Sequence, residues 1–352
     1  MFGPIRFVTD SLLNVALGGS WDVLYVIENA NWSIAADGYY LTKNLRRNAI
    51  LQARTTTSTR FMRSKIVHFG DVHLAVERSY GYDYSGQKRV LTWFHVVPGS
   101  PENRVLVEQQ ELFPFIHTSC VNTRNKLIEM GIKPERICVI PLGVDAELFD
   151  GPDDRERTKD GLKIPDGAVV VGSFQKDGVG WGLGDEAKLI KGPDILVEVV
   201  KRLAQRYPVH VLLIGPARGY VMKNLRASGV PFTHIGYLKD YRGIAKYYRA
   251  LDLYLITSRI EGGPKAILEA WASGVPVVST RVGMVPDIGK DQETVLLADV
   301  GDVETLYRKS AQVIENRQLG SDLSRRGRMA MKSYSWDNIA RQYYQRIYSK
   351  LL

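Results

Sequence analysis

The feature that most constrains the fold of this chain is the alternation of short apolar runs with segments of helical character. Runs rich in Val, Ile and Leu are typical of strands that are buried on both faces of a parallel sheet. Such strands are expected at residues 22–27, 65–69, 89–95, 115–119, 137–140, 168–172, 210–215, 252–256 and 275–279. Helices are expected at 38–51, 122–130, 193–206, 244–250 and from Pro264. This order predicts an α/β protein with helices on both faces of its parallel sheets.

A polar, turn-rich segment at residues 143–167 divides the alternation into two halves, as a domain linker does. A chain of 352 residues is also long for one domain and typical of two. We therefore expect two doubly wound, Rossmann-like domains that face each other, comprising residues 1–145 and 146–336. Ligands of such sheets bind at the carboxyl ends of the strands, so the expected site lies in a cleft between the domains.

The formal net charge of +9 favours anionic partners such as a nucleotide or anionic lipid headgroups, although a solvated basic surface is the simpler explanation. No zinc-finger spacing or aromatic RNA-binding motif accompanies the basic runs, so nucleic acid is not an expected partner. Cys120 and Cys138 adjoin apolar residues and are expected to be reduced and buried, which favours a cytoplasmic protein. Neither a membrane-spanning run nor a secretory signal is expected.

Residues 261–278 form the most informative stretch, because two carboxylates lie there eight positions apart. Glu261 is in a Gly-Gly-Pro turn, and Glu269 is on the helix that follows, for which Pro264 is the expected first residue. Free backbone N–H groups at a helix start suit an anion or a polar ligand. The stretch therefore predicts a ligand site at the carboxyl edge of a sheet. The alternative for Glu269 is an exposed helix residue paired with Lys265.

A second group of motifs runs from the strand near residue 171 through a glycine-rich loop, 178–184, to Lys191 and Gly192. A lysine at a helix start is electrostatically unfavourable, because the N-terminal end of a helix is positive. This favours a functional role for Lys191 over that of an ordinary surface residue. His95 is expected at the carboxyl end of a strand, a position that distinguishes it from a typical core histidine.

These motifs resemble the large group 1 family of retaining, nucleotide-sugar-dependent glycosyltransferases (family 4 type), which have the two-Rossmann GT-B fold. The resemblance covers most of the chain and is weakest over the first 65 residues. It rests on the E-x7-E pattern of Glu261 and Glu269 with its Ala-Ser-Gly-Val-Pro-Val-Val tail, on Lys191-Gly192, and on Pro-Leu-Gly-Val-Asp at 141–145. It implies that the last helix, 337–352, crosses back and packs on the N-terminal domain.

The resemblance also implies roles for individual residues. Glu261 is expected to face the hydroxyls of the donor sugar, and Glu269 to accept hydrogen bonds from the ribose, because a carboxylate suits a vicinal diol. Lys191 is expected to hold the donor diphosphate and to stabilise the charge that builds on it. The other expected donor-binding residues are Gly262, Gly263, Pro264, Lys265, Ile235, Gly236 and Tyr237, with residues 234–238 equally explained as a plain strand and turn.

This chain departs from the family pattern in both halves. Ser173 occupies the position of a diphosphate-binding arginine, and Lys176, three residues later, is a candidate to supply the missing charge. His95 matches a histidine that lies near the donor sugar and the acceptor, and we include it among the catalytic residues. The glycine-rich loop that should follow the first strand is replaced by Glu-Asn-Ala-Asn-Trp at 28–32, so acceptor and phosphate contacts there are not predicted.

We therefore expect a transferase that moves a hexose-type sugar from a nucleotide diphosphate donor to a hydroxyl acceptor, either a glycan or a glycolipid, with retention of anomeric configuration. No metal-binding cluster is visible, and no cofactor besides the donor substrate is expected. The alternatives are a sugar-nucleotide epimerase or glycoside hydrolase on the same fold, and a non-catalytic module that binds nucleotide sugars or anionic lipids. A NAD-dependent dehydrogenase is poorly supported, because the glycine fingerprint is absent.

The family-level expectation for the cellular role is polysaccharide or glycolipid assembly for the cell envelope. It places the protein in the cytoplasm, with peripheral contact to the inner face of an anionic membrane as an option that the basic charge allows. The sequence leaves open the donor sugar and base, the acceptor, the linkage, the oligomeric state and the substitute for the missing arginine.

Overall fold

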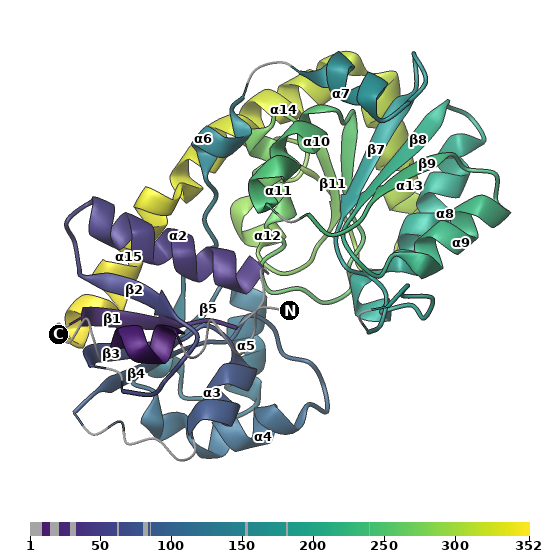
Figure 1. Cartoon of the computed structure of the whole chain (residues 1–352). Coiled ribbons are helices and arrows are strands. Elements are labelled where there is room, and N and C mark those ends of the chain that lie inside the picture. The colour runs from purple at the N-terminus through teal and green to yellow at the C-terminus, as the bar shows by residue number, and fades with distance from the viewer. Residues whose placement is uncertain are drawn as a thin grey trace. The chain divides into compact units, whose positions relative to one another are not determined.

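The computed structural model describes residues 9–14, 21–28, 33–61, 63–79, 84, 86–151, 154–180, 182–238 and 240–352. The backbone divides into two compact units. The first unit comprises Met1–Gly143 with Tyr334–Leu352, and the second comprises Val144–Ser333. Each unit has its own six-stranded parallel sheet (Figure 1). The predicted α/β fold class, with two Rossmann-like domains, is confirmed.

The sheet of the first unit has the strand order β2-β1-β3-β4-β5-β6. Its strands are β1 (Trp21–Val26), β2 (Ala53–Thr56), β3 (Ser64–Phe69), β4 (Lys88–Thr92), β5 (Phe115–Thr118) and β6 (Ile137–Val139). The helices that connect them are α2 (Ser33–Arg47), α3 (Val72–Ser79), α4 (Pro101–Glu108) and α5 (Val121–Glu129), with 3-10 turns η1 (Gln110–Leu112) and η2 (Pro134–Arg136). The central strands are buried on both faces, as their continuous apolar sequences predict.

The end of the chain completes the core of this first unit, which confirms the predicted crossing helix. Helix α15 (Trp336–Arg346) begins after Ser335, whose side chain accepts a hydrogen bond from the backbone of Asn338 as an N-cap. It packs on α2 and is followed by the 3-10 turn η6 (Tyr348–Lys350). A Cβ on Gly143 would lie 2.5 Å from the Trp336 ring, so only glycine allows this approach.

A buried hydrogen-bonded chain ties the C-terminal segment to the sheet of the first unit. His68 Nδ1 lies 2.6 Å from the Tyr348 hydroxyl, and its Nε2 lies 2.8 Å from Thr92 Oγ1. The Thr92 hydroxyl continues to His117, which also contacts the Tyr343 hydroxyl at 2.9 Å. Burial lowers the pKa of both histidines, that of His117 to about 4, so the network is neutral and structural at physiological pH.

The sheet of the second unit has the order β12-β11-β10-β7-β8-β9. Its strands are β7 (Val169–Phe174), β8 (Val209–Ile214), β9 (Phe232–Ile235), β10 (Leu253–Ile256), β11 (Val277–Thr280) and β12 (Leu296–Ala298). The helices are α6 (Ala146–Phe149), α7 (Arg155–Gly161), α8 (Pro193–Ala204), α9 (Gly219–Ala227), α10 (Ala245–Arg249), α11 (Ala266–Ala272), α12 (Val285–Ile288), α13 (Val303–Glu315) and α14 (Arg317–Met331). The 3-10 turns are η3 (Leu189–Lys191), η4 (Tyr241–Ile244) and η5 (Lys332–Tyr334).

The core of the second unit lies between its sheet and helices α8, α9 and α13 (Figure 1). Helix α8 buries Ile195, Val199 and Leu203, whose spacing places them on one face of the helix. Helix α11, with the fully buried Trp271, packs against strands β10 and β11 and against helix α14. The sheet is thus covered on both faces, and the loops after its strands remain free to form a site.

The sequence-based prediction is wrong in several details of the secondary structure. The expected linker, 143–167, contains helices α6 and α7, and Arg155 anchors α7 to the segment before β10 through the Leu251 carbonyl at 2.7 Å. Strand β4 ends at Thr92, so His95 lies three residues beyond the strand. Strand β2 was not predicted, because Ala-Arg-Thr-Thr has no apolar run.

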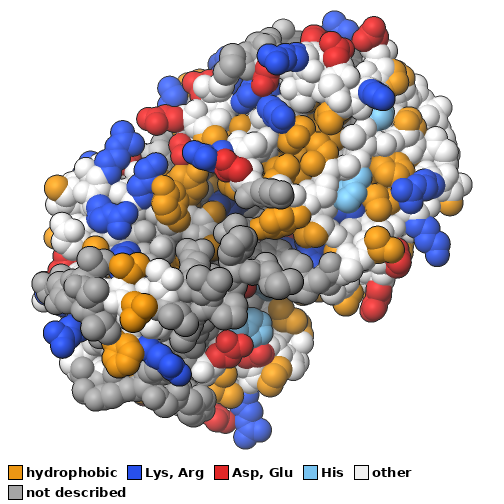
Figure 2. Space-filling model, viewed as in Figure 1, with side chains coloured by type: hydrophobic (Ala, Val, Ile, Leu, Met, Phe, Trp, Pro, Cys, Tyr) orange, Lys and Arg blue, Asp and Glu red, His pale blue; other side chains and the backbone are white. Residues whose placement is uncertain are grey.

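The unit boundaries lie at residues 143/144 and 333/334, beside the expected 145/146 and 336/337. Cys120 and Cys138 are free and buried, as predicted. On the face drawn in Figure 2, Lys and Arg side chains are scattered among acidic ones and form no single continuous patch. Within the described part of the chain, no helix has both the length and the apolar composition needed to cross a membrane.

Candidate functional site

Lys191 and Glu261 meet at the carboxyl edge of the second unit's sheet. The Lys191 ammonium donates to Glu261 Oε1 at 2.6 Å, and the Ser258 hydroxyl donates to the same oxygen at 2.9 Å. The side chains of Lys191 and Glu261 are 20% and 12% exposed, so both are largely enclosed but reachable from solvent. Residues that lie 70 positions apart in the sequence are thereby joined in one charged corner.

The backbone around Lys191 is fixed to the loop after β10. Gly192 has a φ of 63°, and a Cβ there would lie only 1.9 Å from the Thr257 carbonyl oxygen. The Thr257 hydroxyl donates to the Gly192 carbonyl at 2.9 Å, and the Ile190 carbonyl accepts from the backbone N–H groups of Arg259 and Ile260. Glycine is therefore required beside Lys191 by both its left-handed backbone and its close packing.

The turn from Glu261 to Pro264 rests on a second glycine. Gly283 has a φ of 53°, and its missing Cβ would lie 2.4 Å from the Gly262 carbonyl oxygen. Helix α11 begins at Ala266 with Lys265 as its N-cap, so the prediction that Pro264 is the first helical residue is wrong. The Pro264 carbonyl instead accepts from Ile267 in a preceding turn. Within the described residues, the backbone N–H groups of Gly262 and Gly263 donate no hydrogen bond.

Glu269 has a different environment from Glu261, although both belong to the same stretch. It lies on α11, is 4% exposed, and accepts a hydrogen bond from the Tyr248 hydroxyl at 2.8 Å. The alternative that Glu269 is an exposed helix residue is therefore wrong. The Lys265 ammonium lies 5.6 Å from the centre of the Tyr241 ring, within cation–π range. The expected contact of Glu269 with a ribose stays a prediction.

The glycine-rich loop forms a short hairpin beside this corner. Gly178 pairs with Ala187 in an antiparallel bridge, and the Lys188 N–H donates to the Asp177 carbonyl at 2.8 Å. The hairpin packs against β8–α9, where a Cβ on Gly184 would lie 2.4 Å from the Ala217 backbone. Its Leu183 carbonyl accepts from the first N–H of α9 at 2.7 Å. Gly178 and Gly184 therefore serve close backbone packing, which anchors the two ends of the loop.

Ser173 lies at the end of β7 and is enclosed by Arg218, a residue that the sequence analysis missed. The Arg218 guanidinium donates to the Ser173 carbonyl at 2.6 Å and to its hydroxyl at 3.2 Å. Arg218 Nε lies 2.9 Å from Asp177 Oδ1, and both side chains are completely buried. Burial raises the pKa of Asp177 despite the opposing effect of Arg218. An arginine immediately after Gly-Pro-Ala at a strand end was the available signal.

Two more lysines lie close to Lys191. Burial lowers the pKa of Lys188, and the positive charges of Lys191 and Lys176 lower it further, while Glu261 opposes them. The structure thus brings the predicted Lys176 to the same basic cluster as Lys191, together with the unpredicted Lys188. An anionic group is electrostatically favoured where several ammonium groups lie close together.

The remaining predicted residues lie on separate elements. His95 is half-buried in the loop after β4 of the first unit. In the second unit, Ile235 ends β9, and its carbonyl accepts from Gly215 at 3.0 Å, while Gly236 and Tyr237 are exposed. Among the described residues, no group of three or more His, Cys, Asp or Glu side chains could hold a metal ion.

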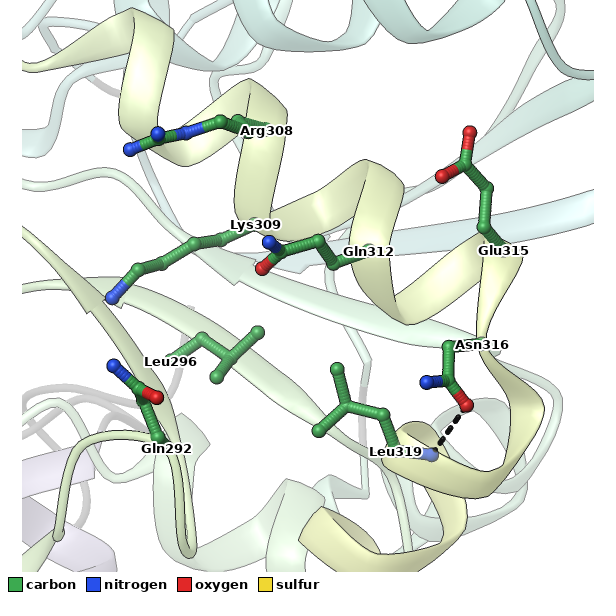
Figure 3. Close-up of a pocket in the computed structure, with 8 residues that line it drawn as sticks. All are labelled: Gln292, Leu296, Arg308, Lys309, Gln312, Glu315, Asn316 and Leu319. Atoms are coloured by element: carbon green, nitrogen blue, oxygen red, sulfur yellow. Dashed lines mark hydrogen bonds between the residues drawn. The ribbon is translucent and has the colours of Figure 1, made fainter.

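A cavity of about 540 Å³ in the second unit contains none of the predicted site residues (Figure 3). It lies between α13, the start of β12 and the start of α14, where Asn316 caps α14 by accepting from Leu319 at 3.0 Å. The Lys309 ammonium at its wall is bound by Asp291 and by the Leu297 carbonyl. This cavity is therefore separate from the corner of Lys191 and Glu261.

Comparison with known proteins relates this geometry to a family. Residues 183–316 match the family model described as glycosyl transferases group 1, and this segment includes Lys191, Glu261 and Glu269. The MMP alpha-(1->4)-mannosyltransferase of Mycolicibacterium hassiacum is 28% identical over 72% of this chain and 57% of its own length. The D-inositol 3-phosphate glycosyltransferase of Corynebacterium efficiens is 26% identical over 80% of this chain and 64% of its own length. The alignments thus span less than two thirds of these relatives.

Solved structures share the fold over nearly the whole chain. HepE from Anabaena, crystallised with UDP and glucose, superposes with a TM-score of 0.77 at 16% identity, covering 92% of this chain and 98% of its own. A glycosyltransferase from Rickettsia africae gives a TM-score of 0.71 at 15% identity, covering 95% and 99%. The two Rossmann-like sheets, the matched segment and these relatives together support a group 1 glycosyltransferase of the GT-B fold.

Proposed function

We propose that this protein transfers a hexose-type sugar from a nucleotide diphosphate donor to a hydroxyl acceptor, with retention of the anomeric configuration. The observation that carries the proposal is the pair of Lys191 and Glu261 at the carboxyl edge of the second sheet, inside the segment that matches the family model. A cation for a leaving diphosphate and a carboxylate for sugar hydroxyls lie there in contact, on backbone fixed by Gly192 and Gly283.

The proposed chemistry uses the side chains of this corner. Lys191 stabilises the negative charge that builds on the diphosphate as the sugar–phosphate bond breaks, and Lys176 adds to the positive field. Glu261 accepts hydrogen bonds from the donor sugar. The N–H groups of Gly262 and Gly263, which donate to no residue that the structure describes, hold oxygens of the sugar or phosphate. Glu269, held by Tyr248, orients the ribose, and His95 contributes near the acceptor. We propose that these lysines, and not a metal ion, meet the charge of the leaving group.

The choice of substrates is guided by the relatives. HepE was crystallised with UDP-glucose as well as with UDP, so UDP-hexoses are the first donors to test. The relatives include a mannosyltransferase and an inositol phosphate glycosyltransferase, so nucleotide-linked mannose is a second donor class to test. We propose a glycan or lipid-linked acceptor in cell-envelope assembly, with the protein in the cytoplasm or in peripheral contact with the inner face of the membrane.

The first test is a thermal-shift screen of the purified chain against UDP, GDP and ADP and their hexose derivatives. A bound ligand raises the melting temperature by mass action, so the stabilising nucleotide identifies the donor base. Sugar transfer is then measured as nucleoside diphosphate released with and without glycan acceptors, and NMR of the product gives its anomeric configuration. Acceptor-dependent release with retention supports the proposal. Nucleotide-sugar binding without turnover with any acceptor tested favours the non-catalytic module. Isomerisation of the donor favours the epimerase.

A further inference from the structure

Lys188 is a half-buried lysine beside the proposed donor site, and its side chain has no partner among the residues that the structure describes. Lys191, three residues later, is held by Glu261 at 2.6 Å. Lys188, in contrast, forms no side-chain hydrogen bond or ion pair with any residue that the structure describes. A partly desolvated ammonium that faces other cations is unfavourable unless an anion joins it. The position therefore calls for a negatively charged ligand.

The hairpin fixes the backbone from which Lys188 extends. The Lys188 N–H donates to the Asp177 carbonyl, and the Lys188 carbonyl accepts from the Lys191 N–H, both at 2.8 Å. One tight turn therefore joins the two lysines. Lys188 also interacts electrostatically with Lys176, Lys191 and Glu261, which places its ammonium among the charges of the corner. The ammonium groups of Lys188 and Lys191 both interact with the carboxylate of Glu261, and only Lys191 is bound to it directly.

Arg218 cannot supply the second cation for this corner. It is the arginine closest to the position of Ser173, but its guanidinium is fully buried and bound to Asp177. It also donates to the carbonyl groups of Ser173, Gln175 and Ile214. Releasing it would leave the Asp177 carboxylate and these carbonyls unsatisfied inside the protein. Arg218 therefore supports the hairpin, and the ligand-facing charge must come from another residue.

We propose that Lys188 binds the diphosphate of the donor together with Lys191, and thereby replaces the arginine that is absent at position 173. This inference rests on the proposed function. Lys188 and Lys191 flank one turn, so two adjacent phosphate groups can each receive an ammonium. Lys176 supplies the surrounding positive field.

The test compares nucleoside diphosphates with the matching monophosphates by isothermal titration. UDP, GDP and ADP are titrated into wild type to find the base, and that diphosphate and its monophosphate are then titrated into Lys188→Ala, Lys188→Gln and Lys188→Arg. The matched control is Lys223→Ala, which removes an exposed lysine from α9. We expect the Ala and Gln variants to bind the diphosphate about 10- to 100-fold more weakly, as for loss of a charged hydrogen bond. Monophosphate binding should change less, and Lys188→Arg should retain most of the affinity.

A pH series gives a second readout that a structural role would not produce. Since burial and neighbouring lysines lower the pKa of Lys188, its ammonium loses its proton earlier than an ordinary lysine as the pH rises. Diphosphate affinity in wild type should therefore fall toward alkaline pH, and Lys188→Arg should weaken this fall because arginine stays protonated.

The inference and the proposed function fail in different ways. Wild type that binds none of the three diphosphates and transfers no sugar contradicts both. Wild type that binds and transfers, together with folded Lys188→Ala and Lys188→Gln variants of unchanged diphosphate affinity, overturns the role of Lys188 alone. Equal losses for monophosphate and diphosphate also overturn it, because Lys188 would then not distinguish the second phosphate.

Discussion

Two ion pairs at the carboxyl edge of the second sheet differ in how deeply they are buried. Arg218 and Asp177 are completely enclosed, with Arg218 Nε 2.9 Å from Asp177 Oδ1. Lys191 and Glu261 are 20% and 12% exposed, with 2.6 Å between their charged atoms. Both pairs join distant segments of sequence, but only the second can exchange its partner for a ligand.

The difference separates structural charge from functional charge. A buried pair owes its position to other polar groups around it, as Arg218 does through three backbone carbonyls. A reachable pair keeps its charges available, and its cost is small because solvent still screens it. A sequence motif with an arginine near Ser173 does not tell whether that arginine belongs to a buried structural pair or to a solvent-accessible functional pair. Mutations can do so, because one pair should determine stability and the other activity.

The largest expected effect is on stability, from breaking the buried pair. Asp177→Ala leaves the Arg218 charge buried without its carboxylate, and we expect the free energy of unfolding to fall by about 3–5 kcal/mol. Chemical denaturation of the purified protein measures it. The double variant Asp177→Ala with Arg218→Met should lose less than the sum of the two single variants. Additive losses would show that the two side chains do not stabilise each other.

The next largest effect is on activity, and it is expected from replacing Lys191 or Glu261. Lys191→Ala and Glu261→Gln should each lower kcat by about 10²- to 10³-fold, the range for removing one group that stabilises transition-state charge. Their unfolding free energies should stay within about 1 kcal/mol of wild type, because the pair is partly solvated. Initial rates at saturating donor, with denaturation curves as the control, separate the two effects. A folded variant with near-normal kcat would remove that residue from the mechanism.

A substitution at Gly192 tests whether the position of Lys191 depends on the glycine beside it. Gly192→Ala introduces a methyl group 1.9 Å from the Thr257 carbonyl oxygen at a φ of 63°. We expect a loss of about 1–3 kcal/mol in stability from the strain and a weaker affinity for the diphosphate as Lys191 moves. The matched control is Gly180→Ala, which also has a positive φ but no atom within 4 Å of the added methyl. Equal affinity in the two variants would show that Lys191 is placed by other contacts.

The same contrast explains what the sequence could predict. The strands and the corner of Lys191 and Glu261 were predictable, because apolar runs set the strand order and the motif places both residues after strands of one parallel sheet. The burial of Glu269 and the role of Arg218 were not predictable, because both depend on side chains from distant elements, Tyr248 and Asp177. The start of α11 was also missed, because Pro264 forms its own turn before the helix.

The smallest effect is expected from a third pair at the same edge, which extends the comparison to higher exposure. Arg259 binds Asp194 through two contacts, of 2.7 Å and 2.6 Å, with both side chains 33% exposed. The hydrogen bonds from Arg259 lower the pKa of Asp194 below its ordinary value of 3.8. Its stabilising contribution is therefore present above that value and is lost as the pH falls through the lowered pKa.

Asp194→Asn should accordingly reduce the unfolding free energy at neutral pH by no more than about 1 kcal/mol, because solvent screens an exposed pair. The difference from wild type should shrink as the pH is lowered through the range below 3.8, where the wild-type carboxylate also becomes neutral. Denaturation curves at neutral and acidic pH measure both values. A loss as large as that of Asp177→Ala, or one that persists in acid, would show that the strength of these pairs does not follow their burial.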